Sequence, residues 1–319
     1  MKIFVTRKIP EIGIKMLREK GYEVEVSDFD GVLPREKLLE KVKGADAILS
    51  LLTDKINAEV FDAAGPQLKI VANYAVGIDN IDLKAAGERK VMISNTPGVL
   101  TESVAEQAIA LIFAISRRIV ESDQFMRDGK YVGWAPMLFL GNDLLGKTLG
   151  LVGLGRIGAA VAKRMHDGFE MKIIYFDVKR NEDLEKQYHL EYKNLESLLK
   201  ESDFISIHVP LTSETKHLIG EPQFKMMKKT AYLINTSRGP VIDENALVKA
   251  LKNNEIKGAG LDVYENEPKM AAGLAELPNT VLTPHTASAT EETRAKMSEL
   301  AAENIITALE GKTPPSLIK

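Results

Sequence analysis

The sequence predicts an α/β protein with mostly parallel sheets, divided into two domains. Apolar strand-like runs and amphipathic helix-like segments alternate along the whole chain, and this alternation is typical of α/β layers. With 319 residues the chain is longer than one hydrophobic core usually supports. A second series of strands and helices starts at Gly146, which again favours two domains.

The first hundred residues contain strand candidates with helical segments between them. Two helical segments end at glycines, Glu11–Lys20 at Gly21 and Arg35–Lys43 at Gly44, as expected of residues that terminate helices. We expect the strands at Lys2–Thr6, Tyr22–Val26, Ala47–Leu52, Leu68–Asn73 and Val91–Ser94.

A long amphipathic stretch begins near Thr101 and stops at Asp128-Gly129. Its apolar residues recur at helical spacing, namely Val104, Ala108, Leu111, Ile112, Ile115 and Ile119. Three interpretations remain open for such a helix: it joins two domains, it contacts a second subunit, or it belongs to the core of one domain.

The second half of the chain repeats the α/β alternation without any fixed-period sequence repeat. A final helix is predicted over about Thr290–Leu309, followed by Pro314-Pro315. The expected strands are Thr148–Val152, Lys172–Phe176, Phe204–Val209, Ala231–Asn235, Ala259–Val263 and Thr280–Thr283.

Composition excludes several classes of function. The net charge is −3 and no long basic run occurs, which argues against a nucleic-acid partner. Cysteine is absent, so disulfides, thiolate zinc sites and a catalytic cysteine are excluded, and we expect no metal. The N-terminus lacks the apolar run of a signal peptide, and charges interrupt the longest apolar helix. We therefore expect a cytoplasmic protein without a membrane partner.

A glycine run, Gly153-Leu154-Gly155-Arg156-Ile157-Gly158, follows an apolar strand and opens a helix. In this context Gly153 permits a tight turn, Gly155 lets backbone approach a pyrophosphate, and Gly158 allows close helix–strand packing. The helix N-terminus supplies free N–H groups for phosphates. The run therefore predicts a dinucleotide site, although a glycine turn that binds nothing is the alternative.

Asp177 closes the next predicted strand, 19 residues after Gly158. A carboxylate at this position can accept hydrogen bonds from both ribose hydroxyls and repels a 2′-phosphate, which favours NAD over NADP. Lys179 and Arg180 lie close by in sequence and weaken this preference.

Three residues that follow predicted strands can carry acid–base chemistry on a carboxylate-bearing substrate. His285 can move a proton near neutral pH, and Glu267 could keep its imidazole protonated and oriented. Arg238 could hold a substrate carboxylate by two parallel hydrogen bonds. Taken singly, each is more often a surface charge or a helix cap, and spacing alone does not join them.

Taken together, these segments resemble the D-isomer-specific 2-hydroxyacid dehydrogenase family over nearly the whole chain. Gly150–Gly158 resembles its nucleotide signature, and Met226–Gly239 resembles its arginine signature. Gly258–Tyr264 with Glu267-Pro268 and Pro284-His285 match the remaining two signatures. The gaps of 29 and 18 residues from arginine to glutamate to histidine also agree with the family.

The resemblance implies two doubly wound parallel-sheet domains with a cleft between them. Residues 1–100 plus 287–319 would form a flavodoxin-like substrate-binding domain, and residues 101–286 a Rossmann NAD-binding domain. It also implies a homodimer built around the cofactor domains and the helix that begins at Thr101.

Carried onto matching positions, the resemblance implies a role for each site residue. Arg238, Glu267 and His285 would be catalytic. Besides Arg238, the substrate would contact Leu52, Ser288 and the backbone N–H groups of Val76 and Gly77. Asp262 would hold the nicotinamide carboxamide, helped by backbone at Ala287. The cofactor residues would be Thr101, Gly153, Gly155, Arg156, Ile157, Gly158, Asp177, Pro210, Thr215, Thr236, Ser237, Arg238, Asp262, His285 and Ala287.

Within the family, the segment Trp134-Ala135-Pro136 followed by Phe139-Leu140-Gly141 is most similar to the glyoxylate and hydroxypyruvate reductases, and Ser288 fits that group. The implied reaction is reduction of a small 2-oxo acid to the D-2-hydroxy acid. The hydride would come from NADH, or from NADPH, and the proton from His285. Ala287 departs from the glycine that family members often have there.

Three alternatives stay open. D-3-phosphoglycerate dehydrogenase should have basic residues after its third strand, whereas Ser50–Asp54 contains no arginine. D-lactate dehydrogenase is the second alternative. The third is a non-enzymatic NAD-sensing corepressor on the same fold, against which the absence of an extended recruiting tail argues.

Overall fold

The structure, a computed structural model, describes residues 1–318. The chain forms two units, each with its own internal contacts. One contains Met1–Leu100 together with the chain from Ala289 onward, and the other contains Thr101–Ser288.

The first unit is built on a parallel sheet with the strand order β2-β1-β3-β4-β5. Its strands are β1 (Lys2–Val5), β2 (Glu23–Val26), β3 (Ala47–Leu51), β4 (Ile70–Tyr74) and β5 (Met92–Ser94). The order reverses between β1 and β3, which makes the sheet doubly wound in the flavodoxin-like manner. The loops after β1, β3 and β4 consequently leave the sheet at one edge.

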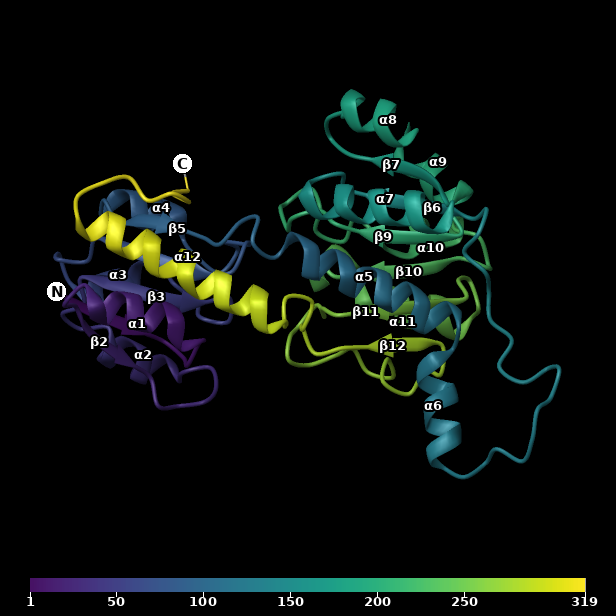
Figure 1. Cartoon of the computed structure of the whole chain (residues 1–319), viewed down its shortest axis with the longest axis horizontal. Coiled ribbons are helices and arrows are strands. Elements are labelled where there is room, and N and C mark those ends of the chain that lie inside the picture. The colour runs from purple at the N-terminus through teal and green to yellow at the C-terminus, as the bar shows by residue number, and fades with distance from the viewer. Residues whose placement is uncertain (319) are drawn as a thin grey trace. The chain divides into compact units, whose positions relative to one another are not determined.

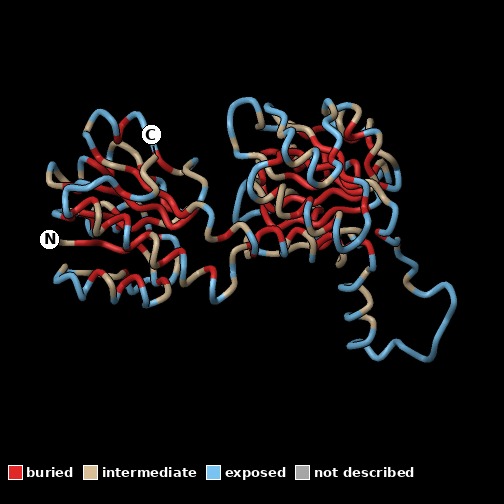
Figure 2. Tube along the Cα trace, turned by 45° about the horizontal axis from the view of Figure 1, so that its top comes forward, coloured by how far each residue is buried: buried red, intermediate tan, exposed pale blue. Residues whose placement is uncertain are grey.

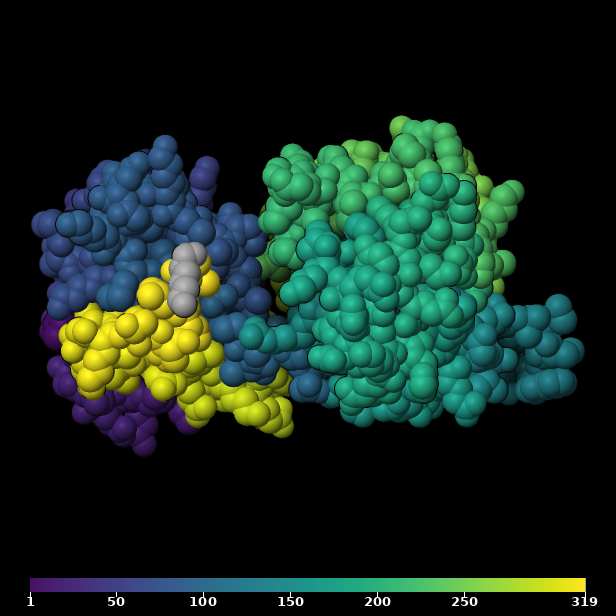
Figure 3. Space-filling model, turned by 90° about the horizontal axis from the view of Figure 1, so that it is seen from above, coloured from purple at the N-terminus to yellow at the C-terminus, as the bar shows by residue number. Residues whose placement is uncertain are grey.

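Helices cover both faces of this sheet (Figure 1). Apolar side chains of α2 (Arg35–Lys41), α3 (Ala58–Ala64) and α4 (Leu83–Glu88) form one core with the strands. On the other face α1 (Glu11–Glu19) contacts α12 (Glu291–Leu309), where a Cβ on Gly13 would lie 2.2 Å from the Ser298 carbonyl oxygen. The C-terminal segment, yellow in Figure 3, thus lies on the same unit as the N-terminal residues.

The second unit is built on a parallel sheet with the order β12-β11-β10-β9-β6-β7-β8. The order reverses between β6 and β9, as in a Rossmann fold. The strands are β6 (Thr148–Val152), β7 (Lys172–Phe176), β8 (Glu191–Tyr192), β9 (Phe204–Ile207), β10 (Tyr232–Asn235), β11 (Gly258–Leu261) and β12 (Thr280–Leu282).

Two apolar cores lie on the two faces of this second sheet, and the buried strands form the red centre of the unit in Figure 2. One core joins the sheet to α5 (Thr101–Ser116) and α7 (Arg156–Phe169), with half-buried side chains of α8 (Glu182–Tyr188) at its margin. The other joins it to α9 (Leu195–Glu201), α10 (Glu221–Met226) and α11 (Glu244–Lys252).

The amphipathic stretch after Thr101 is two helices, α5 and α6 (Ile119–Arg127), and the single long helix predicted there is wrong. Arg118, between them, has a left-handed backbone with φ of 54°. The Ser116 carbonyl accepts a hydrogen bond from the Asn142 N–H at 2.9 Å, so the returning chain takes an acceptor that a continuing helix would use. Of the open interpretations, α5 fits a core helix because Ala108, Leu111 and Ile112 are buried.

The predicted fold class, two doubly wound parallel sheets, is confirmed, and the expected strands end within two residues of the observed ones. The short edge strand β8 was not anticipated, since two residues carry no periodicity. Within residues 1–318, no helix is both long and apolar enough to cross a membrane.

Candidate active site

The three predicted catalytic residues follow three neighbouring strands of the second unit. Arg238 follows β10, Glu267 lies in the segment after β11, and His285 follows β12. These strands are parallel and adjacent, so their carboxyl ends meet at one edge of the sheet. This is the edge at which open α/β sheets bind ligands.

Glu267 and His285 form a hydrogen-bonded pair. The Nδ1 atom of His285 lies 2.9 Å from Oε2 of Glu267, while Oε1 of Glu267 accepts the Tyr264 N–H at 3.1 Å. Burial raises the pKa of Glu267, but the hydrogen bond and charge of His285, the Tyr264 N–H and the charge of Arg238 together hold that pKa below its usual range. Glu267 is therefore a carboxylate aligned on one ring nitrogen of the histidine.

Asp262 holds the loop that carries His285. Sequence reasoning named Asp262 only for the nicotinamide carboxamide and missed this supporting role. Its carboxylate is fully buried and accepts hydrogen bonds from the Thr286 and Ala287 N–H groups, each at 2.8 Å, and from the Thr283 hydroxyl at 2.6 Å. Its backbone carbonyl accepts the His285 N–H at 2.8 Å. These bonds fix His285 in a left-handed conformation with φ of 54°. A buried aspartate directly after a strand was the available signal.

The turn that carries Arg238 is held by Asn235, at the end of β10. The Asn235 Oδ1 atom accepts from the Ser237 N–H at 3.0 Å and from the Ser237 hydroxyl at 2.8 Å, and Nδ2 donates to the Arg238 carbonyl at 3.0 Å. The Thr236 hydroxyl is buried and has no hydrogen-bond partner among residues 1–318.

The glycine run has the geometry of a phosphate-binding turn. Gly153 has φ of 100°, and a Cβ on Gly158 would lie 2.2 Å from the Gly153 carbonyl oxygen, so both positions require glycine. A Cβ on Gly155 would meet no atom within 4 Å, which leaves open space in front of the backbone. Gly155 is the residue before α7, and Arg156 is the first residue of that helix. The N-terminus of α7 therefore offers unpaired backbone N–H groups next to this open space. The turn therefore fits a dinucleotide pyrophosphate.

Asp177 is joined to the glycine run. Its Oδ2 atom accepts the Leu154 N–H at 2.7 Å, which places the carboxylate beside the turn. The guanidinium of Arg180 is bound to Glu185, to which it donates two hydrogen bonds at 3.1 and 2.6 Å, and not to Asp177. The arrangement fits a carboxylate that accepts hydrogen bonds from ribose hydroxyls.

Other predicted residues of this unit lie at the same carboxyl edge. Thr215 donates its hydroxyl to the Pro210 carbonyl at 2.6 Å and closes the loop after β9. Thr101 is the first residue of α5, and Ser288 is the last residue of the unit. The site roles of these residues, and of Ala287, stay predictions.

The predicted substrate residues of the first unit lie in two loops that side-chain hydrogen bonds join to each other. Asn80 donates to the carbonyls of Leu51, at 3.1 Å, and Asp54, at 3.0 Å, and so spans the loop that contains Leu52. Asn73 donates to the Gly77 carbonyl at 2.9 Å and to Oδ1 of Asn80 at 3.0 Å. The Leu52 loop and the Val76–Gly77 loop are thereby held at the carboxyl ends of β3 and β4.

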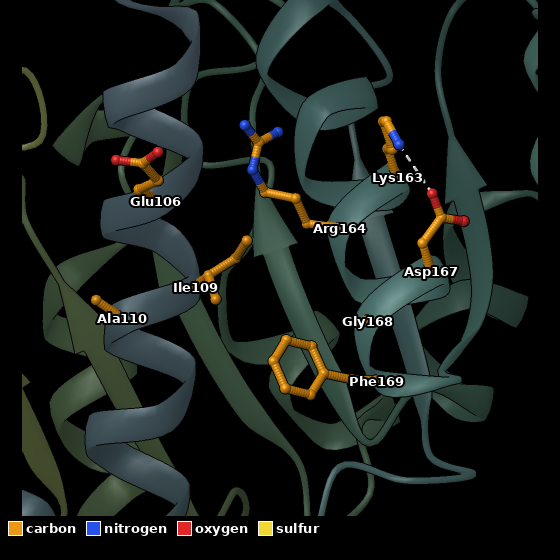
Figure 4. A pocket seen from close by; sticks show the side chains of 8 residues that line it. All are labelled: Glu106, Ile109, Ala110, Lys163, Arg164, Asp167, Gly168 and Phe169. Carbon is orange, nitrogen blue, oxygen red and sulfur yellow. Dashed lines mark hydrogen bonds and ion pairs between the residues drawn. The ribbon is translucent and has the colours of Figure 1, made fainter.

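An open pocket of about 570 Å³ lies between α5 and α7 (Figure 4). None of its lining residues belongs to the predicted site, and its Lys163 and Asp167 neutralise each other at 2.9 Å. The lining residues are Glu106, Ile109, Ala110, Lys163, Arg164, Asp167, Gly168 and Phe169. Within residues 1–318, no cluster of three or more potential metal ligands occurs.

Comparison with known proteins identifies the family. A protein-family model described as "D-isomer specific 2-hydroxyacid dehydrogenase, NAD binding domain" matches residues 109–287 of the chain. A curated glyoxylate reductase from Korarchaeum cryptofilum is 54% identical over 319 residues, covering 99% of this chain and 95% of the relative. The chain belongs to the D-isomer-specific 2-hydroxyacid dehydrogenase family. The predicted family and the predicted enzyme class, an oxidoreductase, are confirmed.

Solved structures agree with this assignment. A protein from Thermus thermophilus matches the dehydrogenase with a TM-score of 0.93 and 44% identity, covering 100% of both chains. An NADPH-dependent glyoxylate/hydroxypyruvate reductase from Sinorhizobium meliloti, solved with NADP and malonate, matches with a TM-score of 0.87 and 34% identity. The alignment covers 99% of this chain and 96% of that one. A nicotinamide cofactor is therefore supported for this dehydrogenase.

Proposed function

We propose that this dehydrogenase reduces glyoxylate or hydroxypyruvate to the D-2-hydroxy acid with NADH. The observation that carries the proposal is the Glu267–His285 pair, with Nδ1 and Oε2 2.9 Å apart, on the strand edge that also carries Arg238. The similarity to glyoxylate reductases along 99% of the chain supports this substrate class.

The bound nicotinamide would supply the hydride, and His285 supplies the proton. Because Nδ1 bonds to Glu267, the imidazolium presents its Nε2–H to the carbonyl oxygen of the substrate. The oxygen takes this proton as the carbonyl carbon gains the hydride, and neutral imidazole remains. Glu267 keeps the ring oriented so that this N–H faces the substrate.

The substrate carboxylate is held by Arg238 and by the backbone N–H groups of Val76 and Gly77, with Leu52 and Ser288 completing the contacts. A guanidinium suits this role because two of its parallel N–H groups match the two oxygens of a carboxylate. The Ser50–Asp54 loop contains no arginine or lysine for a second anion. Small unphosphorylated 2-oxo acids are therefore the expected substrates.

The cofactor would be held by the glycine run, Asp177 and the residues predicted around them. The open space before Gly155 and the N-terminus of α7 suit the pyrophosphate, and the Asp177 carboxylate suits the adenosine ribose. Asp177 disfavours a 2′-phosphate, and Glu185 already binds Arg180, which supports a preference for NADH. The Asp262 carboxylate and Ala287 would contribute at the nicotinamide carboxamide.

Self-association completes the proposal. The segment 119–145, here termed the arm, comprises α6 and the chain after it, and it extends away from the body of its unit (Figures 1 and 2). Val132 is 99% exposed and Trp134 is 82% exposed, and α6 buries none of its residues. Apolar surface of this extent favours an interface with a second copy of the chain. We expect a homodimer.

A steady-state screen tests the proposed function. Glyoxylate, hydroxypyruvate, pyruvate and 3-phosphohydroxypyruvate are each assayed with NADH and with NADPH. The proposal expects the highest kcat/KM for glyoxylate or hydroxypyruvate with NADH. A best rate with the phosphorylated acid would assign the chain to the phosphoglycerate branch, and no turnover of any acid would favour an NAD-binding sensor.

A further inference from the structure

A buried carboxylate outside the catalytic triad lies behind the loop that carries Glu267. Glu244, the first residue of α11, is only 4% exposed. Its Oε2 atom accepts the Glu265 N–H at 2.7 Å, and its Oε1 atom accepts the Ala271 N–H at 2.8 Å. These two donors stand on either side of Glu267 in the chain, so one side chain holds both ends of the loop.

The hydrogen bonds of Glu244 have to be maintained because the carboxylate has no cationic partner. No lysine, arginine or histidine forms a salt bridge with Glu244 within residues 1–318. Burying an ionised carboxylate is costly unless hydrogen bonds compensate it. The two backbone N–H groups supply that compensation, and any displacement of the loop would remove it.

Glu265 and His217 extend the same network to the arginine turn. Glu265 returns a bond to Glu244 by accepting the Glu244 N–H at 3.3 Å on Oε2, and its Oε1 lies 2.6 Å from Nε2 of His217. The backbone N–H of His217 donates to the backbone carbonyl of Pro240, two residues after Arg238, at 2.8 Å. The arginine turn and the glutamate loop thus share one set of hydrogen bonds.

The two loops are also in direct contact at a glycine. A Cβ on Gly239 would lie 1.9 Å from the Tyr264 carbonyl, so the backbone of the arginine turn rests on the backbone of the glutamate loop. The Tyr264 hydroxyl donates to the Thr283 carbonyl at 3.0 Å, just before His285. Movement of the loop 265–271, which carries Glu267, would therefore displace Arg238 and His285 as well.

We propose that Glu244 is a positioning residue of the reaction, which fixes the loop 265–271 so that Glu267 stays aligned on Nδ1 of His285. The inference rests on the proposed function, in which His285 donates the proton. Glu244 does not touch the reacting atoms. It acts because a displacement of about 1 Å would break the hydrogen bond of the Glu267–His285 pair.

The test is Glu244→Gln in the full-length enzyme. The amide keeps the size of the side chain, but its NH₂ group faces a backbone N–H and cannot accept, so one of the two bonds is lost. We expect kcat for glyoxylate reduction to fall by about 10- to 100-fold. The pH–rate profile of reduction should shift toward acid, because a displaced Glu267 would support the imidazolium of His285 less strongly. The Kd for NADH should stay within about twofold of wild type.

Asp203→Asn is the matched control. Asp203 is a carboxylate of the same unit that accepts the Thr148 N–H at 3.0 Å and Nζ of Lys228 at 2.9 Å. It precedes β9 and so lies at the amino edge of the sheet, away from the site. This variant should lose stability yet keep the wild-type pH–rate profile, which separates positioning from a general structural effect.

Each outcome decides between the alternatives. A folded Glu244→Gln enzyme with wild-type kcat and pH profile would overturn the inference. If that variant does not fold, His217→Gln weakens the same network from its exposed side, and it must shift the profile in the same direction for the inference to stand. A wild-type protein that reduces no 2-oxo acid would instead contradict the proposed function.

Discussion

Asp177 illustrates how one carboxylate can select a cofactor. Its Oδ2 atom is anchored to the Leu154 N–H of the glycine run at 2.7 Å, so its charge stays beside the turn. A 2′-phosphate brought to this position would meet that charge, and like charges in contact cost several kcal/mol. At the scale of single residues, cofactor choice should therefore depend on Asp177.

We expect Asp177→Ala to narrow the preference for NADH over NADPH by about tenfold or more, since the repulsion is removed. The measurement is kcat/KM for both cofactors at saturating glyoxylate. Asp183→Ala, which removes an exposed carboxylate on α8, should leave the ratio unchanged. A wild-type enzyme that already prefers NADPH would contradict this prediction.

Arg238 gives a second prediction at the residue scale. Arg238→Lys retains the positive charge but loses the planar pair of N–H groups that matches a carboxylate. We expect kcat to fall and KM for glyoxylate to rise together. Steady-state kinetics with glyoxylate measure both effects. Lysine supporting wild-type kcat/KM would show that a point charge is sufficient.

At the scale of elements, the loop after β9 couples protonation to stability. His208 bonds to the Ser206 hydroxyl through Nε2 at 2.9 Å, and burial of its ring lowers its pKa to about 4. In the unfolded chain the imidazole binds a proton near pH 6.5. The unfolded state therefore holds more protons between about pH 6.5 and pH 4, and the free energy of unfolding must fall as the pH is lowered through this range.

We expect this loss to be about 1–2 kcal/mol. The lowered pKa of the buried ring alone would give more, but the residue as a whole keeps some contact with solvent, which screens part of the effect. His208→Gln keeps a side chain that can hydrogen-bond the Ser206 hydroxyl, and it removes the titration of the imidazole. Urea unfolding at pH 7 and pH 4.5 measures the difference for both proteins. The same pH dependence in the variant and the wild type would exclude His208 as its source.

The sequence predicted elements where periodicity and local signals agree. The glycine run, the strands before it and after it, and the C-cap glycines of the first unit are local features, and their elements lie close to the expected residues. The break between α5 and α6 depends on Asn142, which returns from far along the chain to the Ser116 carbonyl. No pattern within residues 101–128 contains that contact.

The residues of the candidate site likewise fall into those that sequence signals identify and those that only the folded structure brings together. Arg238, Glu267 and His285 were reached through family signatures, because residues 29 and 18 positions apart cannot be joined by spacing alone. Asp262 and Glu244 support the site through backbone N–H groups of loops that lie close only in the folded chain. Such supporting contacts depend on tertiary packing.

At the scale of the whole molecule, the arm should govern assembly. Trp134→Glu places a charge in the apolar surface that we assign to the dimer interface, where burial without a partner is costly. We expect the variant to be monomeric at concentrations where the wild type is dimeric. Sedimentation velocity measures the mass of each. A wild type that is monomeric at all concentrations would contradict the proposed homodimer.

The central claim is that His285 donates the proton in a nicotinamide-dependent reduction of a 2-oxo acid. The most direct measurement is the kcat of His285→Ala for glyoxylate reduction, with the Kd for NADH measured on the same preparation. The account predicts a kcat lower by roughly 10²–10⁴-fold and nearly unchanged NADH binding. A variant that binds NADH and keeps the wild-type kcat would remove His285 from the mechanism and contradict the account.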